Sequence, residues 1–326
     1  MIHEHNQRRI KKALVTGAAG FIGSHLAEAL VKKGVEVVAI DDLSAGKTEN
    51  LESVRSSGLL KEVIGDITNK NQVYDAMQGV DTVFHLAASK KNICLINPHR
   101  DLEVNGGGTL NLLQAAVDLG VEHFVHASTG SVYGSSSVFP QTETNPLHPV
   151  SFYGVSKLAG ESYVRTFSKI HGLNTTVLRY FHVYGPRQES SDVGGVVSIF
   201  IKRALTGEPL IIHGDGLQMR TFTWVGDVVE SNIKSATNSS AIGKIYNCAS
   251  GIRVTVLDLA SLVSQILGKT LKIKHGSELV GDIREFDVSN TLIRDDLGIT
   301  FETDFRRGLE VTVKWGNQYF LNRPSH

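Results

Sequence analysis

The sequence is poor in cysteine and has no net charge, and each scarcity excludes a class of protein. Among 326 residues only Cys94 and Cys248 are cysteines, and they lie far apart and outside any metal-ligand spacing. We therefore expect reduced thiols of a cytoplasmic protein and no metal site. Lysine and arginine together number 33, as do aspartate and glutamate. This balance gives no electrostatic case for binding nucleic acid or an anionic membrane.

Long apolar segments of membrane or secretory type are also missing. No apolar run approaches the roughly 20 residues that a membrane-spanning helix needs. The first twelve residues, MIHEHNQRRIKK, are polar and basic and lack the apolar core of a signal peptide. The chain contains no low-complexity segment and no solenoid-type repeat. We expect a cytoplasmic protein of two coupled lobes, because the length exceeds what one small core requires.

The chain does contain a glycine-rich turn between two apolar runs. Residues 13–42 read ALVTGAAGFIGSHLAEALVKKGVEVVAIDD, a pattern that predicts strand, tight turn, helix and second strand. Gly17, Gly20 and Gly23 allow a tight turn and a close approach of the backbone to a pyrophosphate. The N-terminus of the following helix offers free N–H groups and a positive dipole to that anion. The alternative is a turn whose glycines only cap a helix.

An acidic pair at the end of the second strand indicates which dinucleotide this turn binds. Asp41 follows the glycine turn by about 20 residues, where a carboxylate can accept hydrogen bonds from the adenosine ribose. A carboxylate there repels the 2′-phosphate of NADP. No arginine follows Asp41 directly, although Lys47 lies a few residues on. The predicted cofactor is therefore NAD.

Strands alternate with helices through most of the chain, which predicts an α/β fold with a Rossmann-type doubly wound parallel sheet. His85 and His126 lie within apolar strands and are interpreted as packed side chains. We assign 1–181 to an NAD-binding domain, to which a strand near 244–249 returns, and 182–326 mainly to a smaller C-terminal substrate-binding lobe. Further strands are expected within 62–67, 81–88, 124–127, 175–181, 210–213, 221–225 and 244–247. Helices are expected within 69–77, 105–119, 153–170, 196–205, 257–267, 290–297 and 309–319.

Tyr153 and Lys157 have the spacing of a catalytic pair. Residues four apart on a helix lie on one face, one turn from each other. An ammonium near a phenol favours the phenolate and lowers the phenol pKa from about 10, which makes a tyrosine a general base. Taken alone, the pair is more often an ordinary surface Tyr–Lys contact, which is common on helices.

Together these motifs resemble the extended short-chain dehydrogenase/reductase family, in particular its NAD-dependent sugar-nucleotide epimerases and dehydratases, of UDP-hexose 4-epimerase type. The resemblance spans nearly the whole chain in the family's order. The matching segments are Thr16-Gly17-x-x-Gly20-x-x-Gly23, Asp41-Asp42-Leu43-Ser44, Gly65-Asp66-Ile67, His85-Leu86-Ala87-Ala88, Val104-Asn105, Ser128-Thr129-x-Ser131-Val132-Tyr133-Gly134, Tyr153-x-x-x-Lys157, Tyr184-Gly185-Pro186-Arg187-Gln188, Gly214-Asp215-Gly216 and Arg220.

The resemblance implies a set of residues that hold NAD over the strand ends. Asp66 and Ile67 would flank the adenine, and Lys157 would hold the nicotinamide ribose as well as tune Tyr153. Lys90 matches a position that contacts the cofactor in some galactose epimerases, with a solvated pair beside Lys91 as the alternative. The expected cofactor-binding residues are Gly17, Gly20, Phe21, Ile22, Gly23, Asp41, Asp42, Ser44, Asp66, Ile67, Leu86, Ala87, Ala88, Lys90, Asn105, Tyr153 and Lys157.

The resemblance also implies a reaction, in which Tyr153 takes the proton of a sugar 4-hydroxyl while C4 gives a hydride to NAD. Thr129 would bind the reacting hydroxyl, unless it only caps the strand end. The 4,6-dehydratases typically carry Asp-Glu after this threonine, but this chain has Gly130 and Ser131, which do not titrate usefully. This favours a 4-epimerase working through a transient 4-keto sugar. A dehydratase using another acid, such as Glu103, remains the alternative.

Two further readings stay open at this point. One is an NAD(P)-dependent reductase of a keto sugar. The other is a non-catalytic nucleotide-binding protein, although such proteins usually lose the tyrosine or the lysine.

Departures from the family's pattern concern the substrate. His182 stands where the family usually has an asparagine that binds near the substrate diphosphate, and Thr221 follows Arg220 where an aspartate is common. Arg220 and Arg284 are expected diphosphate ligands, with a surface ion pair as the alternative for Arg284. The expected substrate is a nucleotide-diphosphate sugar, most plausibly a UDP-sugar, bound by Thr129, Ser131, His182, Arg220 and Arg284. A homodimer pairing through helices 105–119 and 153–170 is also expected.

Overall fold

The computed structural model describes residues 8–89, 91–136, 138–191, 194–278 and 287–321. Two expected site residues, Lys90 and Arg284, lie outside these ranges. Among the described residues, no helix is long and apolar enough to cross a membrane. The same ranges hold no cluster of three acidic, histidine or cysteine side chains that suits a metal ion.

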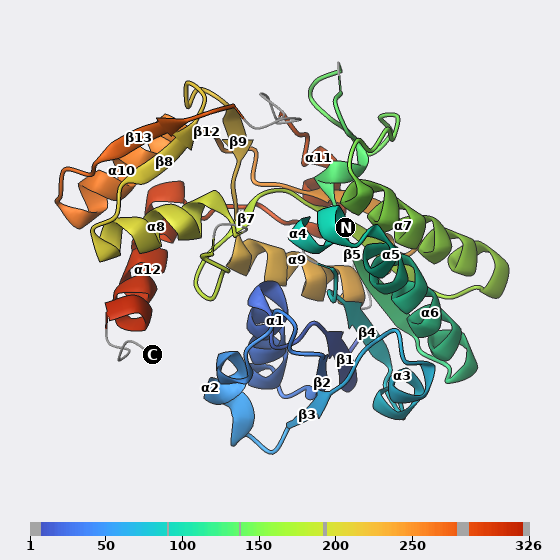
Figure 1. Ribbon diagram of the computed structural model, residues 1–326. Helices are drawn as coiled ribbons and strands as arrows, with labels where there is room; N and C mark the ends of the chain where they lie inside the picture. Colours follow the sequence, from blue (N-terminus) through green and yellow to red (C-terminus); the bar gives the residue numbers. More distant parts are fainter. Residues whose placement is uncertain (1–7, 90, 137, 192–193, 279–286, 322–326) are drawn as a thin grey trace, which may run out of the picture.

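Seven strands of the described chain form one parallel sheet, as the sequence predicts (Figure 1). Its strand order is β11-β6-β5-β4-β1-β2-β3, so the order reverses between β1 and β4. In open parallel sheets a ligand binds outside the carboxyl ends of the strands at such a reversal. The strands are β1 (Lys12–Thr16), β2 (Glu36–Asp41), β3 (Leu60–Ile64), β4 (Thr82–His85), β5 (His123–Thr129), β6 (Thr175–Tyr180) and β11 (Ile245–Cys248).

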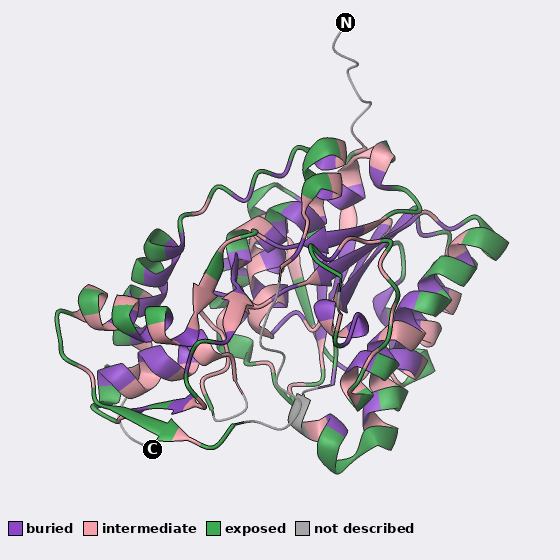
Figure 2. Ribbon diagram, turned by 90° about the horizontal axis from the view of Figure 1, so that it is seen from above, coloured by how far each residue is buried: buried purple, intermediate pink, exposed green. Residues whose placement is uncertain are grey.

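Helices cover both faces of this sheet because successive strand residues point to opposite sides. Val15 packs on the face covered by α1, α9 and α11, whereas Leu14 packs on the face covered by α3, α6 and α7. Figure 2 shows the central strands of the sheet buried and many exposed residues on the outer helix surfaces, whereas the edge strand β3 has no buried residue. The helices of this part are α1 (Phe21–Lys32), α2 (Glu52–Arg55), α3 (Lys70–Ala76), α4 (Lys91–Ile96), α5 (Pro98–Leu102), α6 (Thr109–Asp118), α7 (Phe152–His171), α9 (Val225–Thr237) and α11 (Thr291–Leu297).

One helical run differs from the single helix expected over 105–119. It begins at Pro98, with α5, and continues through the π-helical turn η2 (Glu103–Gly108) into α6. The side chain of Asn97 caps its start by accepting a hydrogen bond from the Arg100 amide at 3.0 Å. Single π-turns inside helices are frequent at functional sites, and this one contains Asn105.

The second lobe has its own apolar core, which includes Phe200, Leu259 and Leu309. Its loop at Pro186 and Arg187 is tied to α1, since Arg187 pairs with Glu28 at 2.6 Å and the Pro186 carbonyl contacts His25 at 3.0 Å. Its elements are β7 (Val183–Tyr184), α8 (Val196–Thr206), β8 (Leu210–His213), β9 (Met219–Thr221), β10 (Thr223–Trp224), β12 (Arg253–Thr255), α10 (Val256–Leu267), β13 (Ile273–Gly276) and α12 (Phe305–Gly316). The remaining short turns are η1 (Thr48–Leu51), η3 (Gly130–Val132), η4 (Ser239–Ala241) and η5 (Asn317–Leu321).

Two expectations for the second half are wrong in detail, and one helix was not expected. The strand expected over 221–225 is two short strands, β9 and β10, that pair with different partners. The segment that follows is a full helix, α9, which the pattern did not indicate. The last helix, expected from 309, begins at Phe305.

Candidate active site

A cavity of about 310 Å³ lies along the carboxyl ends of the strands. It extends from Asp66, beyond the edge strand β3, past the glycine turn after β1, to Ser128 on β5 and Tyr180 on β6. It therefore crosses the point where the strand order reverses, which is where this class of sheet binds dinucleotides. The expected residues that line it are Gly17, Gly20, Phe21, Ile22, Gly23, Asp41, Asp42, Ser44, Asp66, Ile67, Leu86, Ala87, Ala88 and Tyr153.

The glycine turn has no room for side chains. Its backbone can therefore come close to the pyrophosphate of a dinucleotide. Gly17 has φ +66°, and a Cβ at this residue would lie 2.9 Å from the Ala87 backbone. A Cβ on Gly23 would lie 2.1 Å from the Gly17 carbonyl oxygen. The turn is thus closed tightly by its glycines, and helix α1 begins directly after it at Phe21. Its first N–H groups can bind a pyrophosphate.

The two acids at the end of β2 have different surroundings. Both oxygens of Asp41 accept backbone hydrogen bonds, from the Leu43 and Ala19 amides at 2.9 Å each. Burial raises the pKa of Asp41, and these amides oppose the shift. Asp42 accepts from Ser44 and has its other oxygen 3.9 Å from Arg100. Each carboxylate oxygen has a second lone pair, so both acids can still accept from ribose hydroxyls.

Tyr153 faces the cavity from the first turn of α7, and its phenol hydrogen bonds to Thr129. Removal from water and the carboxylate of Asp101 raise the pKa of Tyr153 to about 12. The expectation of a lowered pKa for Tyr153 is therefore wrong for the protein alone, because burial and the charge of Asp101 raise it. Burial also lowers the pKa of Lys157 to about 8, against the opposing charges of Asp101 and Glu161.

Asn105 does not line the cavity but supports the residues that do. Its Oδ1 accepts from the Ser89 amide at 3.0 Å. Its Nδ2 donates to the Ser156 hydroxyl at 2.9 Å and to Asp101 at 3.1 Å. Lys157 likewise lies beneath the cavity wall, with 2% of its surface exposed. Both residues are thus fully inside the protein next to the site.

Thr129 caps a turn, as one of its two expected roles requires, and it also contacts Tyr153. Its Oγ1 accepts from the Ser131 amide at 3.2 Å, at the start of the turn η3. Its hydroxyl also donates to the Ser131 hydroxyl at 3.3 Å. Position 130 has no space for a side chain, since a Cβ there would lie 2.3 Å from the buried ring of Phe181. Glu103 lies elsewhere, paired with Arg100 at 2.9 Å.

The expected substrate residues of the second lobe lie away from this cavity. His182 has φ +37°, and its ring packs edge-on against Phe222 at 6.1 Å. Histidine and asparagine are among the residues that tolerate this left-handed backbone, so the replacement is compatible with the fold. Arg220 lies on β9 and donates to the Met219 carbonyl at 2.8 Å.

The interpretation of His85 and His126 as packed side chains is confirmed, since both are fully buried. His85 contacts the hydroxyls of Thr16 at 2.9 Å and Thr109 at 2.8 Å. Within the described chain, neither ring nitrogen of His126 has a hydrogen-bond partner. Burial, and then the charge of Lys157, hold the pKa of both histidines well below the usual value, so both are neutral.

Sequence reasoning missed several residues of the cavity wall. They are Ile40, Ala45, Gly46, Gly65, Ser89, Ile93, Arg100, Val104, Ala127, Ser128 and Tyr180. Of these, Arg100 carries a charge into the cavity. The available signal was helical spacing, because Arg100 lies four residues before Val104 and next to a proline-initiated turn. The sequence pattern begins this helix at 105, so it does not place Arg100 on the same helical face as Val104.

Comparisons with known proteins agree with this geometry. The family described as the NAD dependent epimerase/dehydratase family matches residues 13–249. The UDP-glucose 4-epimerase of Mycolicibacterium smegmatis is 34% identical, over 96% of this chain and 99% of that protein. A UDP-N-acetyl-alpha-D-glucosaminuronate decarboxylase of Bacillus cytotoxicus is 33% identical, over 94% of this chain and 97% of that protein.

Solved structures extend the likeness to the fold. The crystal structure of UDP-glucose 4-epimerase with UDP-glucose from Thermotoga maritima has a TM-score of 0.88 and 35% identity. That match covers 94% of this chain and 99% of the other. The similar proteins thus include both epimerases and a decarboxylase.

Proposed function

The chain belongs to the NAD-dependent epimerase/dehydratase family, and on this premise we propose that it is a sugar-nucleotide 4-epimerase. One observation carries the choice of reaction. The two positions after Thr129, where the dehydratases carry acids, hold Gly130 and Ser131. The ring of Phe181 occupies the space that a side chain at position 130 would need. The elimination chemistry of a dehydratase therefore lacks its acid and base at this turn.

Glu103 does not replace them. Its carboxylate pairs with Arg100 at 2.9 Å, and Arg100 also binds Asp66 beyond the edge strand β3. Tyr153 lines the opposite end of the cavity, by β5 and α7, and Thr129 contacts it there. An acid held at the edge strand does not serve a reaction at the other end. This argues against Glu103 as the acid of a dehydratase.

In the proposed mechanism Tyr153 removes and returns the proton of the sugar 4-hydroxyl. When bound, NAD supplies removal and return of the hydride at C4, and its positively charged ring favours the phenolate of Tyr153. Thr129 hydrogen bonds to the phenol and so holds it, and any hydroxyl beside it, in one geometry. Lys157 adds a positive charge one helical turn from Tyr153. Epimerisation needs no further acid or base, because the same tyrosine acts in both directions.

We propose that the substrate is a UDP-sugar, because relatives over nearly the whole chain are named as enzymes of UDP-sugars. His182 and Arg220, and Arg284 beyond the described residues, are the proposed ligands of the diphosphate. The two cysteines are buried and form no disulfide with each other, in keeping with a cytoplasmic enzyme.

The test is incubation with UDP-, GDP-, CDP- and dTDP-hexoses and hexuronates, with the products identified by NMR. We expect interconversion of C4 epimers of one nucleotide series and no loss of water or carbon dioxide. A 4-keto-6-deoxy product or a pentose would contradict the proposal. Tyr153→Phe is the matched control: it removes the base with little change in volume. That variant should lose about 10²- to 10⁴-fold in turnover while still binding NAD.

We also propose the expected homodimer, formed by the outer face of α7 and of α4 and α5, which pack against it, in place of the expected pairing of 105–119 with 153–170. Exposed apolar side chains gather on this face. They are Leu95, Ile96, Leu102, Phe152, Val155 and Tyr163. Such a patch marks an interaction surface, and identical copies pair most often with twofold symmetry. Light scattering at micromolar concentration should give twice the chain mass, and Ile96→Glu should lower it to one chain.

A further inference from the structure

We propose that Arg100 is a positioning residue for the adenine of the dinucleotide, acting by holding the carboxylate of Asp66. The family and the cavity indicate where NAD lies, but they assign no role to an arginine at this position. The inference depends on NAD binding alone and not on which sugar reaction follows.

The cavity itself identifies which part of NAD meets Arg100. Its reactive end contains Tyr153, so the nicotinamide belongs there. Asp66, Ile67 and Arg100 line the opposite end, beyond the edge strand β3. A dinucleotide extended along the strand ends with its pyrophosphate at the glycine turn therefore places its adenine against Asp66 and Arg100.

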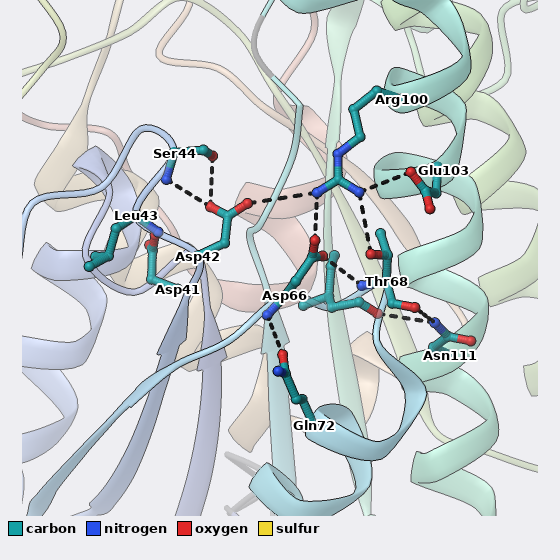
Figure 3. Close-up of polar contacts among 11 residues, drawn as sticks. Asp41, Asp42, Leu43, Ser44, Asp66, Thr68, Gln72, Arg100, Glu103 and Asn111 are labelled. Atoms are coloured by element: carbon teal, nitrogen blue, oxygen red, sulfur yellow. Dashed lines mark hydrogen bonds and ion pairs between the residues drawn. The ribbon is translucent and has the colours of Figure 1, made fainter.

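Arg100 reaches from α5 to the loops after β2 and β3 (Figure 3). Its NH2 nitrogen lies 2.6 Å from Asp66 Oδ2 and 3.9 Å from Asp42 Oδ2. Its NH1 nitrogen binds Glu103 Oε2 at 2.9 Å and the Thr68 hydroxyl at 3.3 Å. One guanidinium thus connects the ribose side of the site with the adenine side. Its planar array of donors suits this multiple contact, which a lysine does not reproduce.

Asp66 is held in one orientation by contacts on both oxygens. Oδ1 accepts from the Thr68 amide at 2.8 Å, and Oδ2 accepts from Arg100. Its own amide donates to Gln72 Oε1 at 2.8 Å, which fixes the backbone as well. Burial alone would raise the pKa of Asp66, but the Thr68 amide and Arg100 outweigh it and lower the pKa. Asp66 is therefore an ionised, acceptor-only group at neutral pH.

A fixed carboxylate at this place discriminates between purine rings. The exocyclic amine of adenine donates hydrogen bonds, and each oxygen of Asp66 keeps a lone pair to accept one. Hypoxanthine has a carbonyl oxygen at that position, which a carboxylate repels. Sites built to hydrogen-bond a substrate group reject analogues that lack it. A purely stabilising role for Arg100 is weakly supported, because partly exposed ion pairs such as Arg100–Asp66, 31% and 32% exposed, add little to stability.

The experiment compares dissociation constants, measured by calorimetry, for NAD and for nicotinamide hypoxanthine dinucleotide. We expect the wild-type protein to bind NAD about tenfold or more tightly than the analogue, as one charge-assisted hydrogen bond implies. Arg100→Ala should weaken NAD binding by about tenfold while leaving the analogue nearly unchanged. Arg100→Lys, which keeps the charge but not the fork, should recover part of the preference. Equal weakening of both dinucleotides, or of neither, would overturn the proposal.

A double variant tests whether Arg100 acts through Asp66. In an Asp66→Asn background, Arg100→Ala should change neither dissociation constant further, and a further loss would also overturn the proposal. The matched control is Arg55→Ala. Arg55 pairs with Glu62 at 2.6 Å outside the cavity, so its loss should leave both constants as they are. Thermal unfolding of each variant shows that the folded protein is being titrated, and Arg100→Lys keeps the test decisive if Arg100→Ala does not fold.

Discussion

The carboxylate of Asp101 lies inside the protein beside the proposed catalytic pair. It is 1% exposed, and Asn105 donates to its Oδ1 at 3.1 Å. Its Oδ2 has no hydrogen-bond partner in the described part of the chain. The charge of Asp101 raises the pKa of Tyr153 and opposes the fall in the pKa of Lys157. Asp101 thus favours the protonated form of both residues, which keeps Lys157 charged but lowers the fraction of Tyr153 present as the phenolate that can accept a proton.

Asp101→Asn should therefore move the pH profile of turnover as a whole. Without the carboxylate, the pKa of Tyr153 falls below about 12 and the pKa of Lys157 falls below about 8. Turnover rises with pH as Tyr153 loses its proton and falls again as Lys157 loses its charge. Both parts of the pH profile should therefore shift to lower pH. Kinetics from pH 5.5 to 9.5 measure this. Asp118→Asn, an exposed acid on the same helical run, is the control, and an unmoved profile in Asp101→Asn would contradict the assignment.

At the scale of elements, the sequence predicts the parts whose pattern is local. The sheet strands and the glycine turn follow from runs such as Leu14–Val15 and from Gly17, because burial on both faces demands apolar strands. Helix α9 was missed because its buried side includes Ser231, Asn232 and Ser235, which interrupt the apolar period. Two of these three polar side chains find partners within the described residues, but the buried Ser235 hydroxyl does not. Asn232, for example, accepts from the Tyr180 hydroxyl at 2.9 Å.

In the candidate site, too, the features with a local sequence pattern were predicted and those that depend on tertiary contacts were not. The glycine turn, the acids after β2 and Tyr153 follow from spacing, and all line the cavity. Arg100 and the pKa of Tyr153 depend on which distant residues meet in space. A sequence pattern contains neither the early start of helix α5 nor the burial of Asp101.

Helix α7 and the π-turn η2 pack so closely that one added methyl group should push them apart. A Cβ on Gly160 would lie 2.8 Å from the Asn105 carbonyl oxygen. Gly160→Ala should therefore cost about 1 to 3 kcal/mol in free energy of unfolding. Gly107→Ala is the matched control on η2, where a Cβ meets nothing within 4 Å and alanine is the better helix former. Urea unfolding should give a loss for Gly160→Ala alone, and equal stability of the two variants would contradict this packing.

At the scale of the whole molecule, the two halves of the chain share the core of the sheet. Val228 and Ala236 of α9, Tyr246 of β11 and Ile293 of α11 pack in one apolar cluster with Leu26 of α1. These late elements cannot be placed from local pattern, since their partners lie some 200 residues earlier, although the return of the strand near 244–249 was anticipated. We expect the sheet and both its helix layers to unfold in one transition, because neither half contains this core alone.

Three fully buried histidines should make the whole molecule sensitive to acid. Burial lowers the pKa of His123 to about 4 and holds those of His85 and His126 well below 6.5. Below pH 6.5 the unfolded chain binds protons at these residues and the folded protein does not. The free energy of unfolding therefore falls as pH falls, by about 2 kcal/mol for each histidine at pH 5. That is a large part of the 5–15 kcal/mol typical of a domain.

Urea unfolding at pH 7.5, 6.5, 5.5 and 5 measures this loss, and His126→Leu isolates one contribution to it. Leucine removes two ring nitrogens that have no hydrogen-bond partner among the described residues, so at pH 7.5 we expect stability within about 1 kcal/mol of wild type. As pH falls, the variant should lose stability less steeply, because its unfolded state binds one proton fewer. His99→Gln, on the exposed side of α5, should follow the wild-type slope. A His126→Leu slope identical to wild type would mean that the buried imidazole does not govern the acid transition.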